Sequence, residues 1–111
     1  MTSVSIILPV FNGEKFIKKA IESVLNQSLN DFELIVINDG STDSTADIIN
    51  SFEDNRIRII NQSNKGPGQA RNNGLKIASG DYIMFLDADD WFCEDALETA
   101  YFEEKNNIAD I

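Results

Sequence analysis

Residues 82–90, with the sequence YIMFLDADD, are an apolar run that stops abruptly at three carboxylates. We expect residues 82–86 to form a buried strand, whose alternating side chains place Asp87 and Asp89 on the same side of its end. Two unit charges about 4 Å apart repel by roughly 4 kcal/mol at an effective dielectric constant of 20. Such crowding predicts a cation at this point, and carboxylate oxygens suit Mg²⁺ or Mn²⁺. The alternative is that Asp90 caps a following helix while Asp87 and Asp89 are solvated.

Further apolar runs precede this one, and amphipathic stretches separate them. The runs are rich in β-branched residues and predict strands at residues 4–10, 32–38 and 56–61, in addition to 81–86. Apolar residues at helical spacing predict helices at about residues 13–27, 42–52, 66–78 and 93–105. Strands separated by helices imply right-handed crossovers and a mostly parallel sheet, so we expect one α/β domain over residues 1–111.

Local signals predict how the helices begin and pack. Asn12 is the expected N-cap of the first helix, and Ser41 or Thr42 that of the second, with Asp43 near its positive end. Arginines alternate with apolar residues in 56–61, as expected toward a sheet edge. The third helix has a face of small residues that allows close packing on the sheet: Ala70, Gly74 and Ala78.

The composition excludes several kinds of site. A net charge of −10 argues against nucleic-acid binding, which depends on lysine and arginine at the phosphates. The chain has no histidine, so it has no histidine-activated nucleophile and no histidine-ligated zinc site. Cys93 is the only cysteine, which excludes an internal disulfide and suits a reducing compartment. No apolar run approaches the roughly 20 residues that span a bilayer, and the start does not resemble a signal peptide, so we expect a cytoplasmic chain without a membrane segment.

Polar, turn-forming residues cluster where the predicted strands end. In parallel α/β sheets, ligands bind outside the carboxyl ends of the strands, where the strand order reverses. The opposite rim of the predicted sheet carries no comparable cluster. We therefore expect one site, formed by residues 9–12, 38–43, 64–66 and 87–90.

Within these clusters, Asp39 and Arg71 have side chains that suit a nucleotide. Asp39, at the tip of the second strand, can accept a hydrogen bond from a ring N–H such as the imide of uracil, although residues 38–41 also suit a simple turn. Phe11 offers an aromatic wall or belongs to the core. Arg71 offers donors to a base or phosphate if it points to the strand ends, and is otherwise a surface residue. The glycine-rich residues 66–71 lack the lysine–hydroxyl ending of a P-loop.

Several segments, in this order and spacing, resemble the amino-terminal, nucleotide-sugar-binding half of the inverting family 2 glycosyltransferases, which adopt the Rossmann-like GT-A fold. The segments are residues 5–12, 34–43, 64–74 and 80–90. The resemblance implies that the complete protein transfers a sugar, with inversion, from a nucleoside-diphosphate sugar, expected to be a UDP-sugar. The acceptor is a hydroxyl group of an unknown carbohydrate, lipid or protein. The resemblance also implies that residues 1–111 form the donor-binding part and that the acceptor part is absent.

Individual residues receive roles from the resemblance. The implied donor-binding positions are Pro9, Phe11, Asn12, Asp39, Arg71, Asp87 and Ala88. Asp89 matches the second carboxylate of the D-x-D motif, which approaches a Mn²⁺ or Mg²⁺ ion that bridges the donor diphosphate. No catalytic residue is assigned, because the family's catalytic base is expected beyond Ile111. We therefore expect this chain to bind donor and metal without transferring sugar by itself.

A magnesium-dependent phosphoacceptor domain of the receiver or haloacid-dehalogenase type is the alternative. Such domains also place aspartates at the ends of parallel strands beside Mg²⁺. Against this alternative, no apolar strand with a downstream lysine follows residues 87–90. A noncatalytic binding module is a third interpretation, and we leave open that the full-length protein is membrane-associated.

Overall fold

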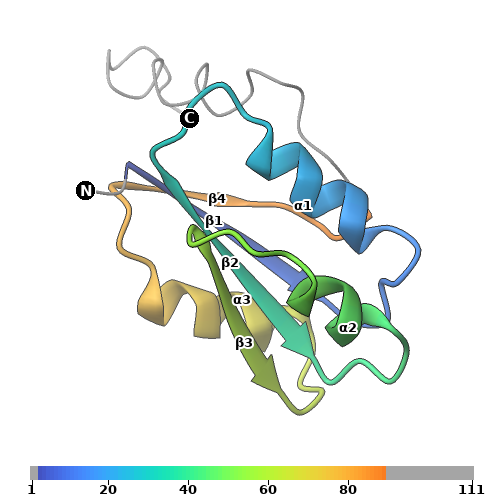
Figure 1. Cartoon of the computed structure of the whole chain (residues 1–111). Coiled ribbons are helices and arrows are strands. Elements are labelled where there is room, and N and C mark those ends of the chain that lie inside the picture. The colour runs from blue at the N-terminus through green and yellow to red at the C-terminus, as the bar shows by residue number, and fades with distance from the viewer. Residues whose placement is uncertain (1–2, 90–111) are drawn as a thin grey trace.

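The computed structural model describes residues 3–89; residues 1–2 and 90–111, which include the predicted helix at 93–105, lie outside this description. The described chain forms a four-stranded parallel sheet in the order β3-β2-β1-β4, with helices on both faces (Figure 1). This confirms the predicted α/β fold. None of the helices in residues 3–89 has the length and apolar character of a membrane-spanning segment. The elements are β1 (Val4–Val10), α1 (Ile17–Leu25), β2 (Phe32–Asp39), α2 (Thr45–Asn50), β3 (Ile57–Gln62), α3 (Pro67–Ile77) and β4 (Tyr82–Phe85).

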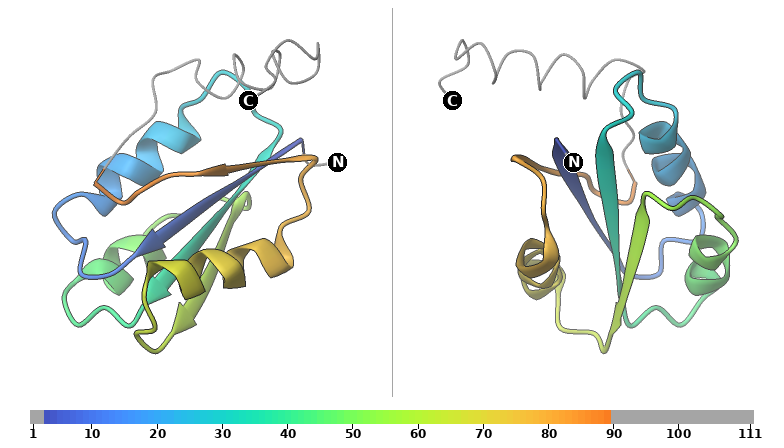
Figure 2. Two further views of the ribbon diagram at one scale, coloured as in Figure 1. Left: turned by 180° about the vertical axis from the view of Figure 1, so that it is seen from behind. Right: turned by 60° about the vertical axis from the view of Figure 1, so that its left-hand side comes forward.

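Helices cover both faces of the two central strands, which explains why β1 and β2 are buried along their whole length. Figure 2 shows α1 and α2 on one face of the sheet and α3 on the other. Successive side chains of a strand point to opposite faces. Ile6 and Leu8 therefore pack in the core beneath α1, while Ile7 packs in the core beneath α3. Strands that are covered on both faces have continuous apolar sequences, and these two strands do.

The two outer strands are more exposed. β3 lies at one edge, as its alternating arginines predict, and Ile59 is 37% exposed. The prediction of a buried strand at residues 82–86 is wrong for β4, because Ile83 and Phe85 are 38% and 48% exposed. Phe85 is paired in register with Ile7, so these side chains point to the face that carries α3. Since α3 packs over β1 and β2, it leaves this part of β4 uncovered.

The first two helices begin later than predicted, and their expected N-caps have other partners. α1 begins at Ile17 and α2 at Thr45, and neither has a side-chain hydrogen bond from the residue before it. Asn12 has a positive φ of 50°, and its Oδ1 accepts a hydrogen bond from the Thr42 N–H at 2.8 Å. The N–H of Thr45 donates instead to Asp43 Oδ1 at 2.9 Å. The predicted caps therefore connect two loops to each other instead of capping the helices that follow them.

Small residues let α3 lie directly against the sheet, as predicted. Ala70 and Gly74 are buried, and Ala78 is half-buried just after the helix. A Cβ atom placed on Gly74 would be 2.8 Å from Ile7 Cγ2 and 3.0 Å from Ile37 Cδ1. Non-bonded carbon atoms prefer separations of about 3.5–4.0 Å, so a side chain at position 74 would push the helix outward. Glycine is therefore required here for the close approach of α3 to β1 and β2.

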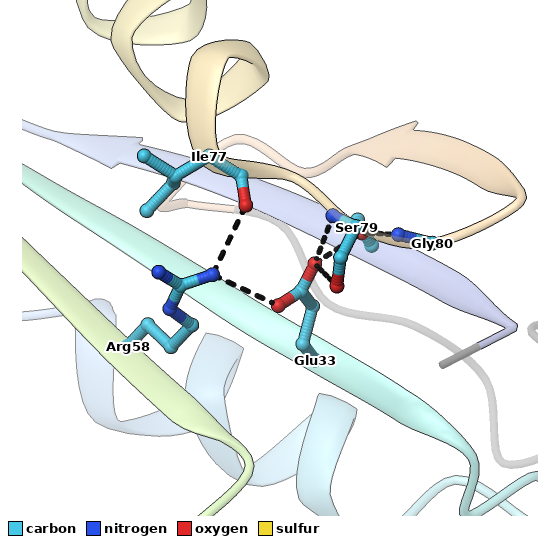
Figure 3. Close-up of polar contacts among 6 residues, drawn as sticks. Glu33, Arg58, Ile77, Ser79 and Gly80 are labelled. Atoms are coloured by element: carbon cyan, nitrogen blue, oxygen red, sulfur yellow. Dashed lines mark hydrogen bonds and ion pairs between the residues drawn. The ribbon is translucent and has the colours of Figure 1, made fainter. Parts of the chain in front are cut away.

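A buried carboxylate ties the connection between α3 and β4 to the sheet, at the end opposite the predicted site (Figure 3). Glu33, on β2, accepts hydrogen bonds from Ser5 Oγ and from the N–H of Ser79, each at 2.6 Å. Arg58, on β3, forms an ion pair with Glu33 at 3.3 Å and donates to the carbonyl oxygen of Ile77 at 3.0 Å. Burial alone would raise the pKa of Glu33, but these donors together hold it below its ordinary value. The sequence shows no polar cluster at this amino-terminal rim of the sheet. The structure nevertheless assembles a polar cluster there from three strands and a loop.

Candidate functional site

A cavity of about 180 Å³ lies at the carboxyl ends of the strands. The strand order reverses between β1 and β4, since β1 pairs with both β2 and β4. Open α/β sheets bind ligands at this position. The residues that line the cavity are Pro9, Val10, Phe11, Asp39, Pro67, Arg71 and Asp87.

The structure brings together most, but not all, of the predicted site residues. Pro67, which sequence reasoning missed as a site residue, also lines the cavity, whereas Asn12, Ala88 and Asp89 do not. Asn12 is directed to the loop after β2, as described above. Ala88 packs against the core beneath α1, and Asp89 is exposed. The predicted residues that do line the cavity are Pro9, Phe11, Asp39, Arg71 and Asp87.

Asp39 is a buried carboxylate in the wall of the cavity, with 3% of its surface exposed. Asp39 Oδ1 accepts hydrogen bonds from Gln62 Nε2 and from the N–H of Lys65, each at 2.8 Å. Asp39 Oδ2 accepts one hydrogen bond, from the N–H of Gly66 at 3.0 Å. Burial alone would raise the pKa of Asp39, but these donors and the charge of Lys65 hold it below its ordinary value. The carboxylate is therefore ionised at neutral pH and acts only as a hydrogen-bond acceptor.

Sequence reasoning placed Asp39 and residues 64–66 at the same rim but missed Gln62. The signal that could have found it is the strand register, which pairs Asp39 with Gln62 across β2 and β3. Gly40 explains how the loop after β3 comes so close. It has a φ of 75°, and a Cβ atom on it would lie 2.6 Å from the backbone nitrogen of Asn64. Only glycine accommodates both that backbone conformation and that approach.

Arg71 and Asp87 form an ion pair at the cavity, with Arg71 Nη2 3.3 Å from Asp87 Oδ1. Their side chains are 38% and 60% exposed, so water screens the pair and its contribution to stability is small. A weakly held pair can exchange its partners for the charges of a ligand. Arg71 thus points to the strand ends, which is the orientation that the sequence left open.

Hydrogen bonds from the loop after β1 to the loop after β2 and to the start of α2 hold the cavity wall that carries Phe11. The N–H of Gly13 donates to Thr45 Oγ1 at 2.9 Å, and the N–H of Glu14 donates to Asp43 Oδ2 at 3.2 Å. Burial would raise the pKa of Asp43, but donors from Thr45 and Glu14 hold it below its ordinary value. Sequence reasoning placed Asp43 at the start of α2 and within the polar cluster 38–43, but missed its contact with the neighbouring loop.

The carboxylates near the cavity do not form a closed metal cage. Within residues 3–89, no three acidic, cysteine or histidine side chains gather closely enough to hold a metal ion. Asp87 and Asp89 are both exposed at the end of β4, and Asp90 lies outside the described residues. Mg²⁺ is commonly held by one or two carboxylates together with substrate phosphates and water. Asp87 and Asp89 fit a site of that open kind.

Comparisons with known proteins place this geometry in a family. The family model described as Glycosyl transferase family 2 matches residues 5–109. The chain is 41% identical over 110 residues to the glycosyltransferase GlyA of Streptococcus pneumoniae, a match that covers 97% of this chain and 16% of GlyA. Crystal structures of S. aureus TarS 1–349 with UDP and with UDP-GlcNAc match with TM-scores of 0.85 and 0.86, at 31% and 32% identity, over 96% of this chain. The mannosyltransferase PcManGT from Pyrobaculum calidifontis, in complex with GDP-Man and Mn²⁺, has the same fold, with a TM-score of 0.78 at 23% identity.

The matches cover nearly the whole chain but only part of each longer protein. The chain spans 16% of GlyA and 33% of the TarS chain that binds UDP. The family match decides against the phosphoacceptor alternative, and the solved structures confirm the expected architecture. The chain belongs to glycosyltransferase family 2 and has the Rossmann-like GT-A fold.

Proposed function

We propose that this chain is the donor-binding part of a glycosyltransferase and holds the nucleoside diphosphate of a UDP-sugar in the cavity at the carboxyl ends of β1 and β4. The observation that carries the proposal is that Phe11, Asp39, Arg71 and Asp87, from four separate segments, line one cavity. TarS, which matches 96% of this chain at 31% identity, was solved in complex with UDP.

Asp39 and Phe11 offer the groups that a uracil base needs. Asp39 is ionised. Among residues 3–89, its Oδ2 accepts one hydrogen bond, from the N–H of Gly66, so it can accept another from a ring N–H. The ring of Phe11 is 50% exposed beside the same cavity and can stack on a planar base. Pro9 borders the base on the side of β1. Asn12 contributes by holding the loop that carries Phe11.

The diphosphate requires positive charge, because the chain itself carries a net charge of −10. Arg71 supplies one cation, which is shared with Asp87 in the absence of a ligand. We expect Asp89, with Asp87 beside it and Ala88 between them, to hold Mn²⁺ or Mg²⁺ against the diphosphate oxygens. When bound, the ion stabilises the negative charge of the departing nucleoside diphosphate.

Sugar transfer itself needs groups beyond these residues. An inverting displacement requires a base within hydrogen-bond reach of the acceptor hydroxyl. The carboxylates of residues 3–89 that face the cavity are already assigned to the nucleobase and the diphosphate. We therefore expect residues 1–111 to bind donor and metal, and the longer family members to supply the catalytic base and the acceptor site.

Calorimetric titration of the full chain with UDP in the presence of Mn²⁺ tests the proposal. Asp39→Ala and Asp89→Ala should each weaken binding by about tenfold or more, because Asp39 is the proposed acceptor for the nucleobase and Asp89 the proposed ligand of the metal ion. Asp47→Ala, which removes an exposed carboxylate from α2, is the control with the same change of charge and should bind like the parent. Equal affinity in all four proteins would disprove the residue assignments.

A metal-free titration separates the role of Asp39 at the nucleobase from the role of Asp89 at the metal ion. Without Mn²⁺, the Asp89→Ala chain should bind UDP as weakly as the parent does, because the ion is then missing from both. Asp39→Ala should still bind more weakly than the parent. Thermal unfolding of each variant shows whether a loss of binding reflects a loss of the fold.

A further inference from the structure

We propose that Gln62 and Asn73 are positioning residues, which hold Asp39 as a hydrogen-bond acceptor toward the base through a directed chain of side-chain amides. This inference rests on the proposed function, because it concerns how the same site selects its ligand. Neither residue lines the cavity, and neither is among the donor-binding positions that the family resemblance implies.

The chain of amides runs from the surface of α3 to the cavity wall. Gln69 Nε2 donates to Asn73 Oδ1 at 3.1 Å, one helical turn along α3. Asn73 Nδ2 donates to Gln62 Oε1 at the end of β3. Gln62 Nε2 then donates to Asp39 Oδ1 at 2.8 Å. Asn73 and Gln62 are both half-buried, so water competes with these bonds less than at the surface.

The direction of each hydrogen bond follows from the backbone around Asp39. The N–H groups of Lys65 and Gly66 can only donate, so the Asp39 carboxylate must accept. Gln62 must then turn its NH₂ group to Asp39, which leaves its Oε1 facing α3. Asn73 must meet that oxygen with its own NH₂ group. An amide has one acceptor oxygen and one donor nitrogen, so each step determines the next.

Position 73 is held by the packing of its helix. The neighbouring Gly74 lies so close to the sheet that a Cβ atom on it would be 2.8 Å from Ile7 Cγ2. This close approach brings Asn73 within reach of Gln62, and the pairing of β2 with β3 places Gln62 beside Asp39. The chain of amides therefore depends on the sheet register and on the helix packing together.

The consequence is a preference for a base with a ring N–H. With Oδ1 occupied by Gln62 and Lys65, Asp39 presents the remaining acceptor position on Oδ2. Uracil has a donor at N3, which matches this acceptor, whereas a ring nitrogen with a lone pair would be repelled. The N–H groups of Lys65 and Gly66 also hold the Asp39 carboxylate, and Gln62 adds a side-chain donor to Oδ1. Lys65, Arg71 and Asp87 are the other charged groups around Asp39 and the cavity.

The test compares UDP with N3-methyl-UDP, which lacks the ring donor, by calorimetry in Mn²⁺ on the full chain. The parent should prefer UDP by about tenfold, the effect of one hydrogen bond to a charged group. Asn73→Asp replaces the donor to Gln62 Oε1 with a carboxylate, which repels that oxygen and draws the Gln62 NH₂ group away from Asp39. The preference for UDP should fall to about twofold or less. Asn72→Asp, the same change at the exposed neighbouring residue, should keep the preference.

Gln62→Met provides an independent variant, because it removes both amide groups at similar length. It should lose the preference as Asn73→Asp does. In both variants, the decline of UDP affinity on acidification should begin at a higher pH than in the parent, because Asp39 loses a donor that favours its ionised form. If Gln62 and Asn73 had a purely structural role, the variants would change the affinity for UDP and N3-methyl-UDP equally. The pH dependence of UDP affinity would then be the same as in the parent.

The outcomes distinguish the inference from the function on which it rests. If the parent prefers UDP and either variant that folds retains the full preference, the role of the amide chain is overturned. If the parent binds UDP and N3-methyl-UDP equally well, the role of Asp39 in the proposed function is overturned instead.

Discussion

Glu33 and Asp39 are buried carboxylates at the two ends of β2, and a comparison of their partners shows what distinguishes a structural from a ligand-binding group. Glu33 accepts hydrogen bonds from Ser5, Ser79 and Arg58 and lies far from the cavity. Asp39 accepts hydrogen bonds from Gln62, Lys65 and Gly66, but it lies in the cavity wall. Burial of a carboxylate is therefore no guide to function unless its remaining acceptor positions are also considered.

Glu33→Gln should reduce stability in a pH-dependent manner. The pKa of Glu33 is lowered below 4.5 in the folded chain, so its stabilising contribution is complete above about pH 4.5 and is lost as the pH falls through the folded pKa. The variant should be less stable at pH 7 by about 1–3 kcal/mol. It should also lose less further stability than the parent between pH 5 and pH 3. Urea unfolding across this range measures both effects.

Glu22→Gln, at an exposed position of α1, is the matched control and should unfold like the parent. If Glu33→Gln and the parent show the same dependence of stability on pH, Glu33 is not held ionised by its hydrogen bonds.

At the scale of the element, α3 carries more of the site than its amphipathic pattern suggests. It brings Arg71 to the cavity and, two residues later, Asn73 to the end of β3. Both positions depend on how closely the helix lies on β1 and β2, and Gly74 sets that distance. The packing of one small residue therefore affects stability and ligand binding together.

Gly74→Ala should destabilise the chain, and Gly68→Ala should not. A Cβ atom at position 74 meets Ile7 and Ile37, and overpacking of this kind costs about 1–3 kcal/mol. A Cβ atom at position 68 of the same helix meets no atom within 4 Å, and alanine is the better helix former by up to about 1 kcal/mol. Denaturant unfolding of the two variants measures the difference. Equal stability of both would show that α3 has room to move outward from the sheet at little cost.

At the scale of the whole molecule, the site exists because a parallel sheet gathers all its strand ends on one side. Phe11, Asp39, Arg71 and Asp87 are far apart in the sequence and meet at the position where the strand order reverses. The chain is strongly acidic, with a net charge of −10, so a diphosphate can bind only where positive charge is concentrated. A divalent ion at the end of β4 would concentrate it there.

UDP should therefore stabilise the fold strongly only when Mn²⁺ is present. A ligand at about one hundred times its Kd adds about 2.7 kcal/mol to the free energy of unfolding, which raises the Tm of a domain of this size by roughly 10 °C. Removal of Mn²⁺ with EDTA should abolish most of this shift. UMP, which has no diphosphate, is the control and should give a smaller shift that depends less on the metal. A UDP-dependent shift of the same size in EDTA would contradict a role for the ion.

Within residues 3–89, local patterns were sufficient to predict the succession of strands and helices along the chain, the parallel sheet and the rim that carries the cavity. Apolar periodicity reports burial of each segment, and turn residues report where each segment ends, so both can be recognised without knowing the partner of any residue. For the same reason, the face of small residues on α3 and the position of β3 at an edge of the sheet were predicted correctly.

Contacts between distant segments were decided only by the tertiary structure. Asn12 bonds to Thr42 instead of capping α1, and Asp39 meets Gln62 and Lys65, because loop conformation and strand register bring these groups together. The exposure of β4 likewise depends on where α3 lies across the sheet. A hydrogen bond forms only when both partners arrive in the correct geometry, and the geometry of residues 23 to 46 positions apart is set by the assembled sheet, not by either segment alone.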